Sequence, residues 1–401
     1  MKQTVKKRIR FYIKFWIGSF VRFVTRIFYI FPVKNNRVLF HAYDAKHICC
    51  NPKYIFENLM KVYPNMFEYI WVLENNEEIE TYKNTGELIR TVKPRSIGFY
   101  VAKASSKVCV INSASFPEIQ LRKNQFQINT YHGGGSYKTA GTATKDADSK
   151  LYLKKLEWDQ KNTSLSLSSS KYFSREVIRK QMTYRGEIYE YGMPRNDILI
   201  HGGSELIVDR VKKKYHIQDT TKIALYAPTY RDIENKYEKI DNNGVLEALN
   251  GRFGGEWVLF YRTHYLSHNA CENQFIVDCS DYPDMQELLC TADVLISDYS
   301  SSIWDYSFTN RPCLLFTPDL DSYISSRGLD TPIETWGFPV CRDNTELITT
   351  IKEWSEETYI KHIEMHHSTL GSCETGKATE IVCQRICDVC FGSHENKSGE
   401  I

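Results

Sequence analysis

The sequence lacks several features that would assign it to a large protein class. In the first 26 residues the longest uncharged stretch is Phe15–Val21, whereas a membrane-spanning helix needs ~20 apolar residues. No small-residue cleavage site follows, which argues against a cleavable secretory signal. The net charge is only +2, so the chain is not a polycation and we expect no nucleic-acid partner.

The sequence also lacks a disulfide or metal-binding pattern. Its 12 cysteines do not have the spacing of a small secreted scaffold, and a chain of 401 residues buries its own core. We therefore expect reduced thiols in a cytosolic protein. Cys383, Cys387 and Cys390 share one helical face, where free cysteine packs as a small hydrophobic residue. No metal site and no cofactor are expected.

Acidic residues are absent from the first 33 positions, which carry eight Lys or Arg residues interleaved with aromatic ones. On a helical projection Lys7, Lys14, Arg22 and Arg26 share one side, and an apolar side lies opposite. This pattern predicts a basic amphipathic helix over 1–33 that binds an anionic membrane surface as a peripheral anchor. The alternative is a helix packed on its own protein with a solvated basic face.

Short apolar segments alternate with helical stretches after Pro32, which predicts βαβ units and parallel sheets. The predicted fold is α/β, with two doubly wound Rossmann-type domains over 34–198 and 199–391, a central cleft and a polar tail over 392–401. Helices are expected at 53–62, 285–290 and 302–308. The expected strands are 37–43, 68–73, 88–92, 107–112, 127–131, 165–168 and 187–191, then 223–227, 257–261, 275–277, 294–297 and 313–316.

A glycine-rich motif, His132–Lys138, directly follows one predicted strand. Consecutive glycines let backbone N–H groups approach an anion closely, and His132 is placed to act as a base. Esterases use a similar oxyanion loop, but the sequence has no G-x-S-x-G nucleophile motif to accompany it. A glycine-rich turn with an incidental histidine is the alternative.

Three further motifs follow predicted strands of the second half. The first contains Thr229 and Arg231, the second Arg262 and His264. Arginine suits bidentate phosphate binding, although each pair by itself is a weak signal. The third, Asp298 followed by Ser300, Ser301 and Ser302, precedes a predicted helix. Hydroxyls and free N–H groups at a helix start favour a phosphate site over ordinary capping. Together these motifs predict a nucleotide-diphosphate donor in the cleft, facing His132.

The ordered set of motifs resembles the CDP-glycerol glycerophosphotransferase family, which includes teichoic acid primases and polymerases. The resemblance covers about residues 37 to 380 and rests on nine segments: 51–55, 132–138, 192–197, 226–232, 262–264, 297–302, 311–312, 319–323 and 376–378. It implies a GT-B-like fold, peripheral attachment at the cytoplasmic face of a bacterial plasma membrane, and CDP-glycerol or a related CDP-polyol as donor. The acceptor would be a lipid-linked teichoic-acid-like or capsular polymer.

By the matching positions, His132 is the general base for an acceptor hydroxyl, and CMP leaves. His264 is the second implied catalytic histidine. The implied donor site comprises Gly133, Thr229, Arg231, Arg262, Asp298 and Ser300–Ser302. The family usually has His-Gly-Thr-Pro where this chain has His132-Gly133-Gly134-Gly135, and Arg-Pro-His-Pro where it has Arg262-Thr263-His264-Tyr265. The acceptor-side loop is therefore altered.

Two other functions are compatible with these motifs. A GT-B glycosyltransferase that uses a nucleotide sugar would need the same phosphate-binding turn. A non-catalytic relative docked on the membrane would need none of the chemistry, although His132, His264 and the serine run are all present.

Overall fold

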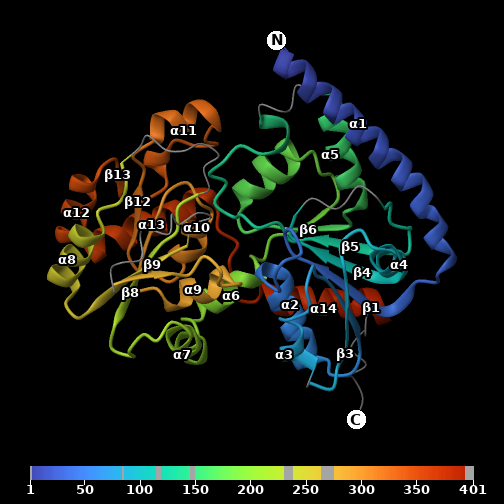
Figure 1. Cartoon of the computed structure of the whole chain (residues 1–401), viewed down its shortest axis with the longest axis horizontal. Helices are drawn as coiled ribbons and strands as arrows, with labels where there is room; N and C mark the ends of the chain where they lie inside the picture. Colours follow the sequence, from blue (N-terminus) through green and yellow to red (C-terminus); the bar gives the residue numbers. More distant parts are fainter. Residues whose placement is uncertain are drawn as a thin grey trace, which may run out of the picture.

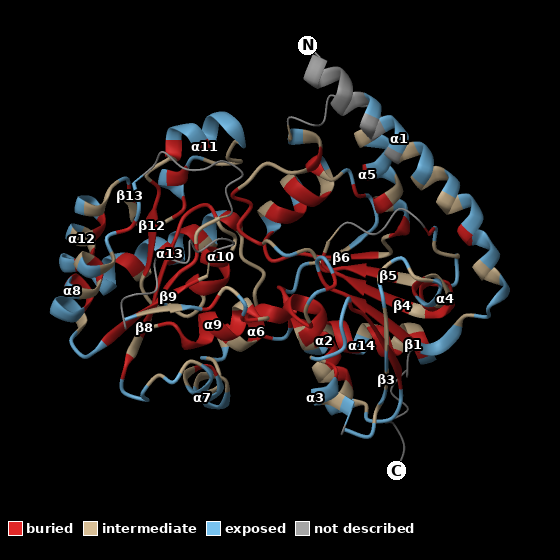
Figure 2. Cartoon of the chain, in the orientation of Figure 1, coloured by how far each residue is buried: buried red, intermediate tan, exposed pale blue. Residues whose placement is uncertain are grey.

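The computed structural model describes residues 2–83, 85–113, 119–144, 150–229, 238–262 and 275–392. They form two α/β domains that lie side by side, with α1 along the outer edge of the first (Figure 1). Each domain has a parallel sheet between helices. The inner strands of both sheets are buried on both faces (Figure 2), which explains why these strands are continuous apolar segments in the sequence.

The first domain contains a seven-stranded sheet, within the described residues, in the order β3-β2-β1-β4-β5-β6-β7. The strands are β1 (Lys34–His41), β2 (Glu68–Val72), β3 (Leu88–Val92), β4 (Ser106–Ile111), β5 (Phe126–Asn129), β6 (Leu165–Leu167) and β7 (Glu187–Tyr189). Its helices are α1 (Lys2–Val24), η1 (Thr25–Ile30), α2 (Cys50–Val62), α3 (Glu80–Lys83), α4 (Ile97–Ser105), α5 (Lys150–Asn162) and the π-helix η4 (Phe173–Gln181).

The second domain repeats the arrangement in a six-stranded sheet of the described chain, ordered β10-β9-β8-β11-β12-β13. Its strands are β8 (Lys222–Tyr226), β9 (Trp257–Tyr261), β10 (Ile276–Asp278), β11 (Val294–Ser297), β12 (Cys313–Phe316) and β13 (Val340–Cys341). The helices are α7 (Glu205–Lys214), α8 (Asn242–Phe253), α9 (Met285–Thr291), α10 (Ser302–Ser307), α11 (Leu320–Ser326), α12 (Asn344–Lys352) and α13 (Glu356–Leu370).

The prediction of two doubly wound domains is confirmed. All neighbouring strands pair in parallel, and the order reverses between β1 and β4 and again between β8 and β11. Such reversals create crevices at the carboxyl ends of the strands. The short edge strand β13 was not predicted.

Two helices connect the domains. α6 (Pro194–Ile200) lies at the junction, and α14 (Ala378–Phe391) returns from the second domain to pack on α2, α6 and β4. Although α14 falls within the range expected for the second domain, its buried face belongs to the core of the first. Cys383, Cys387 and Cys390 are buried on this face as packing residues.

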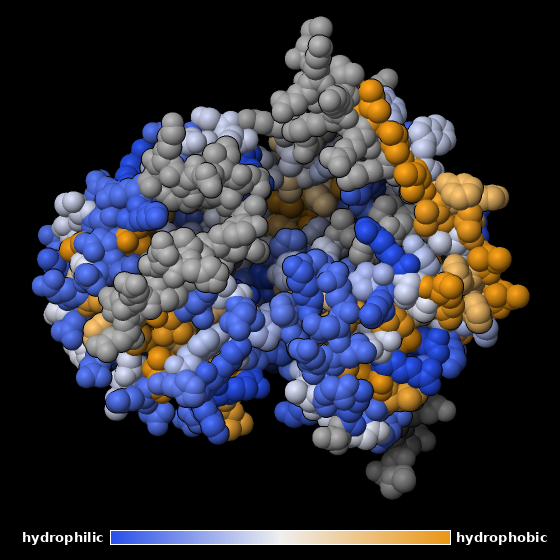
Figure 3. All heavy atoms as spheres, in the orientation of Figure 1, coloured by the Kyte–Doolittle hydropathy of each residue, from blue (hydrophilic) through white to orange (hydrophobic). Residues whose placement is uncertain are grey.

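The N-terminal segment is helical, with α1 lying on α5. Phe15 stacks on Trp158 at 4.7 Å between ring centroids, and Arg22 lies over the same indole. The outward side is apolar and exposed, and Figure 3 shows it as an orange band along α1. Within the described chain, no helix has the length and apolar character that a bilayer crossing requires. Exposed apolar residues of α1 and η1 include Ile9, Ile13, Trp16, Ile17, Phe20, Phe23, Ile27 and Ile30.

Candidate active site

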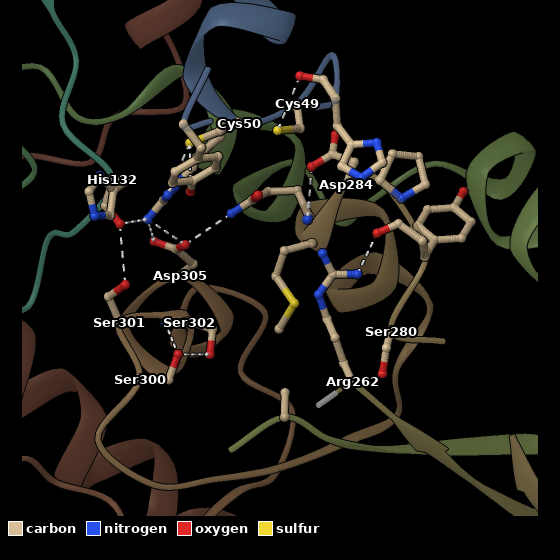
Figure 4. A pocket seen from close by; sticks show the side chains of 18 of the residues that line it. Cys49, Cys50, His132, Arg262, Ser280, Asp284, Ser300, Ser301, Ser302 and Asp305 are labelled. Carbon is tan, nitrogen blue, oxygen red and sulfur yellow. Dashed lines mark hydrogen bonds and ion pairs between the residues drawn. The ribbon is translucent and has the colours of Figure 1, made fainter. Parts of the chain in front are cut away.

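A cavity of about 720 Å³ lies between the domains, where loops follow the carboxyl ends of β1, β5, β8, β9, β10 and β11. Figure 4 shows His132, Cys50, Ser301 and Asp305 on one side of it and Arg262 and Ser280 on the other. The cavity therefore occupies the position that the strand order predicts for a ligand site. His132, Thr229, Arg262 and Ser300–Ser302, all predicted from the sequence, line the same space.

His132 has a defined orientation at the wall of the cavity. Its Nδ1 lies 2.7 Å from the backbone carbonyl of Asn112, and its ring contacts Tyr43 edge-on. Because a carbonyl only accepts hydrogen bonds, Nδ1 carries the proton and Nε2 is the basic nitrogen. The ring faces the cavity, yet the surrounding protein desolvates it and lowers the pKa of His132, with the charges of Arg195 and Lys138 adding to the effect. The imidazole is thus neutral at pH 7, as a general base must be.

The glycine loop after His132 is packed rather than open. A Cβ on Gly134 would lie 2.5 Å from Trp304 and 2.7 Å from the Ser169 hydroxyl, and one on Gly135 would overlap Tyr137. Gly133 differs, because its nearest neighbour would be the Cβ of Ser301 at 3.8 Å. Gly134 and Gly135 are buried, so their lack of a side chain allows close packing, and the expected role of the glycines as an anion cradle stays a prediction.

Thr229 and Asp298 form a tight polar contact beside the cavity. The Thr229 backbone N–H donates to both Asp298 oxygens, at 2.9 and 3.0 Å, and its hydroxyl donates at 2.7 Å. Asp298 is buried and does not line the cavity. Its carboxylate holds the loop after β8, and Thr229 is the member of the pair that faces the ligand space. Lys138, from the first domain, reaches across to donate to the Thr229 hydroxyl at 3.2 Å.

Arg262 and the serine turn form the rest of the second-domain wall. Arg262 donates to the backbone carbonyl of Tyr282 at 2.6 Å, which fixes its guanidinium beside the loop after β10. The Ser302 hydroxyl and backbone N–H both point to the Ser300 hydroxyl, and Ser301 donates to the His132 carbonyl at 3.2 Å. These hydroxyls and two cations, Arg262 and Lys138, are suited to a diphosphate.

Arg231 and His264 lie outside the described residues, so their predicted roles stay predictions.

Other residues of the site were not predicted as site residues, although their positions in the sequence give a simple signal. Tyr43 and Asn112 both come directly after strands, where side chains converge on the cleft. Arg195 lies in the Pro-Arg-Asn-Asp segment at the junction of the domains. The described residues contain no group of three or more His, Cys, Asp or Glu side chains that could hold a metal ion.

The model of one protein family matches residues 23–388, nearly the whole of both domains. Its description is CDP-Glycerol:Poly(glycerophosphate) glycerophosphotransferase. The chain belongs to this family. The family that the sequence motifs resemble is thereby confirmed.

Two curated relatives in the glycerophosphotransferase family are named teichoic acid poly(glycerol phosphate) polymerase. The one from Staphylococcus epidermidis is 29% identical over 381 residues, which is 87% of this chain and 50% of the relative. The one from Bacillus spizizenii is 28% identical over 383 residues, 90% of this chain and 95% of the relative. The chain thus spans about half of the length of the first relative and nearly all of the second.

A solved structure of the wall teichoic acid polymerase TagF, from a crystal soaked with CDPG, has the same fold. It superimposes with a TM-score of 0.78 and 25% sequence identity, covering 97% of this chain and 98% of the other. The predicted GT-B-like fold of this chain is therefore confirmed.

Proposed function

We propose that the protein transfers glycerol phosphate, or a similar polyol phosphate, from CDP-glycerol to a hydroxyl of a teichoic-acid-like or capsular polymer, and releases CMP. The observation that carries this proposal is the placement of neutral His132, with Nε2 as its basic nitrogen, in a cavity that is also lined by the serine turn, Lys138 and Arg262. Family membership supports the choice of a CDP-polyol over a nucleotide sugar.

The reaction follows from these groups as one displacement. The acceptor hydroxyl gives its proton to Nε2 of His132 as its oxygen forms a bond to the glycerol-bearing phosphorus. The bond between that phosphorus and the bridging oxygen breaks, and the electron pair leaves on CMP. Arg262, Lys138 and the Ser300–Ser302 hydroxyls stabilise the charge that develops on the phosphate oxygens. Arg231 and His264 are proposed to assist, and Asp298 acts through Thr229.

We further propose that the protein works as a peripheral protein at an anionic membrane surface, on the cytoplasmic face, and that its acceptor is lipid-linked. The exposed apolar side of α1 and η1 supports this, with Trp16, Phe20 and Ile27 between 67% and 70% exposed. The same segment carries eight basic residues and no acidic one, which favours anionic lipid.

A donor panel tests the reaction. The full chain is incubated with CDP-glycerol, CDP-ribitol, a CMP-sugar and UDP-sugars in the presence of membranes, and released CMP, CDP and UDP are separated. We expect CMP from a CDP-polyol, together with a new phosphodiester in the polymer. Release of UDP from a UDP-sugar, or of CMP from the CMP-sugar but not from the CDP-polyols, would instead identify a glycosyltransferase, and no release from any donor would favour a non-catalytic relative.

A further inference from the structure

Arg195 joins three separate elements at the base of the cavity. It is the second residue of α6, at the junction of the domains, and its side chain is 4% exposed. Nη1 donates to the Cys50 sulfur of α2 at 3.2 Å, and Nη2 donates to the His132 carbonyl at 2.9 Å. Nη2 also pairs with Asp305 of α10 at 2.8 Å. One guanidinium therefore contacts α2 and the loop after β5 in the first domain, and α10 in the second domain.

The backbone carbonyl of His132 is held by Arg195 at the junction of the domains and by Ser301 of the second domain. Its carbonyl accepts from Arg195 and also from the Ser301 hydroxyl, in the turn proposed to bind the diphosphate. Arg195 is in turn fixed by Asp305, four residues after Ser301. His132 and the donor-binding turn are thus linked twice, directly through the Ser301 hydroxyl and indirectly through Arg195 and Asp305.

We propose that Arg195 is a positioning residue that sets His132 in register with the donor-binding turn of the opposite domain. The inference rests on the proposed function, because His132 is the base in that reaction. Reacting groups must be held close to the productive geometry, and a misplacement of about 1 Å can cost about 10²-fold in rate. Arg195 is suited to this task because its planar fork bonds several acceptors at once.

Lysine is not an equivalent side chain at this position. Burial alone would lower the pKa of Arg195, but the adjacent Asp305 carboxylate raises it well above its ordinary value, so the guanidinium stays charged. Asp305 itself accepts a further bond from Gln286 at 2.9 Å. A lysine would keep the charge and lose the fork, and one ammonium cannot reproduce bonds to Cys50, His132 and Asp305 together.

The test compares Arg195→Lys and Arg195→Gln with the wild-type full chain in the CMP-release assay. For both variants we expect kcat to fall about 10²-fold while the KM for CDP-glycerol changes only a few-fold, because the donor-binding groups are intact.

The groups facing His132 are Tyr43, Cys50, Lys138 and Arg195, with Asp305 behind Arg195. Arg195→Gln removes a positive charge from this set and leaves Asp305 unpaired. The acid limb of its pH profile should therefore move to higher pH, whereas Arg195→Lys should leave the limb in place.

Chemical rescue separates positioning from folding. Guanidinium chloride at low millimolar concentration should restore part of the activity of Arg195→Ala and have no such effect on His132→Ala. Arg311→Lys is the matched control, because Arg311 also holds backbone carbonyls, those of Cys290 and Ala292, but lies away from the cavity. It should keep wild-type kcat.

Two outcomes would overturn the inference. One is wild-type kcat in Arg195→Lys and Arg195→Gln. The other is a loss of activity that matches the unfolded fraction of the protein, with no shift of the acid limb and no rescue.

Titration of the histidines by NMR in labelled protein needs no turnover, with His132→Gln giving the assignment. An altered His132 titration in Arg195→Gln would support the link even if wild-type protein released no CMP, which would contradict only the proposed function.

Discussion

His132 combines a fixed tautomer with a suppressed charge, and both come from its immediate neighbours. The Asn112 carbonyl takes the Nδ1 proton, and the desolvated site with Arg195 and Lys138 disfavours the imidazolium ion. The first effect leaves Nε2 as the ring nitrogen without a proton. The second keeps Nε2 unprotonated at pH 7, which is what the proposed role of His132 as general base requires.

The pH profile of kcat/KM tests this property of His132. A lowered pKa means that the neutral, active imidazole persists as the pH falls, until the pH reaches that lowered value. The acid limb should therefore have its midpoint below 6.5, the ordinary pKa of histidine. A midpoint above 6.5 that is assigned to His132 would contradict the described environment.

Gly133 and Gly134 provide a matched pair of substitutions. Gly134→Ala places a Cβ against Trp304 and Ser169 and should destabilise the fold by about 1–3 kcal/mol. Gly133→Ala meets only Ser301 at van der Waals distance and should leave stability unchanged. Urea unfolding of the two variants measures the difference. Equal stability of both would show that the loop is not packed as described.

The sequence predicts which residues lie at the ends of strands and therefore near the cleft. It does not predict roles that depend on a contact with a residue far away in the sequence. The positions of His132, Thr229 and Arg262 in one cavity follow from the strand-end rule. The bond by which Asp298 holds Thr229 joins residues 69 positions apart. No local spacing carries that information, and the same holds for the contact of Gly134 with Trp304.

At the scale of elements, one side of α1 packs on the protein and the opposite side is exposed. Phe15 and Arg22 contact Trp158 of α5, whereas Trp16 and Phe20 are 68% and 67% exposed. Deleting the helix would uncover Trp158, so substitutions on the exposed side are a cleaner test.

We expect Trp16→Glu with Phe20→Glu to abolish sedimentation with vesicles that contain phosphatidylglycerol, because both charges would have to enter the lipid interface. Leu206→Glu is the control, since Leu206 is also an exposed apolar residue, on α7 of the other domain. It should leave sedimentation unchanged. Undiminished binding by the double variant would show that this side of α1 does not contact lipid.

The strands were predictable and some boundaries were not. β3, β9, β11 and β12 begin and end at the expected residues. For β9, β11 and β12 the reason is that a buried parallel strand is a short apolar run between polar ones. β13 has two residues and gives no such pattern. α2 begins at Cys50, before the expected start, since Asn51 and Pro52 at its first turn are buried by the junction.

At the scale of the molecule, a buried ionic network joins the domains beside the cavity. Lys53 of α2 bonds Asp284, at 2.7 Å, and Glu287 of α9. Tyr54 and Arg210 bond the same two carboxylates. Lys53 is 8% exposed and its partners less so, so the network fixes how the first domain sits on the second.

Lys53→Met should destabilise the protein by about 3–5 kcal/mol, because it leaves the buried Asp284 carboxylate without its ammonium partner and leaves Glu287 paired with Arg210 alone. Lys161→Ala removes an exposed pair with Glu157 and should leave the unfolding midpoint unchanged. Thermal unfolding of both variants checks the contrast. A midpoint for Lys53→Met equal to that of Lys161→Ala would mean that the network does not hold the domains together.

The return of α14 to the first domain is a whole-molecule feature that local patterns do not reveal. Its apolar and cysteine face predicts a buried helix but not which core buries it. The chain order alone would place it with the second domain, and only the packing on α2 and α6 decides otherwise.

The most direct test of the proposed reaction is CMP release from CDP-glycerol by wild-type protein and by His132→Ala, with a glycerol-phosphate acceptor present. The wild type should release one CMP for each phosphodiester formed. His132→Ala should retain its fold and lose about 10²–10⁴-fold in rate, the contribution of a general base. A variant that keeps the wild-type rate would contradict the assignment of His132 as the base.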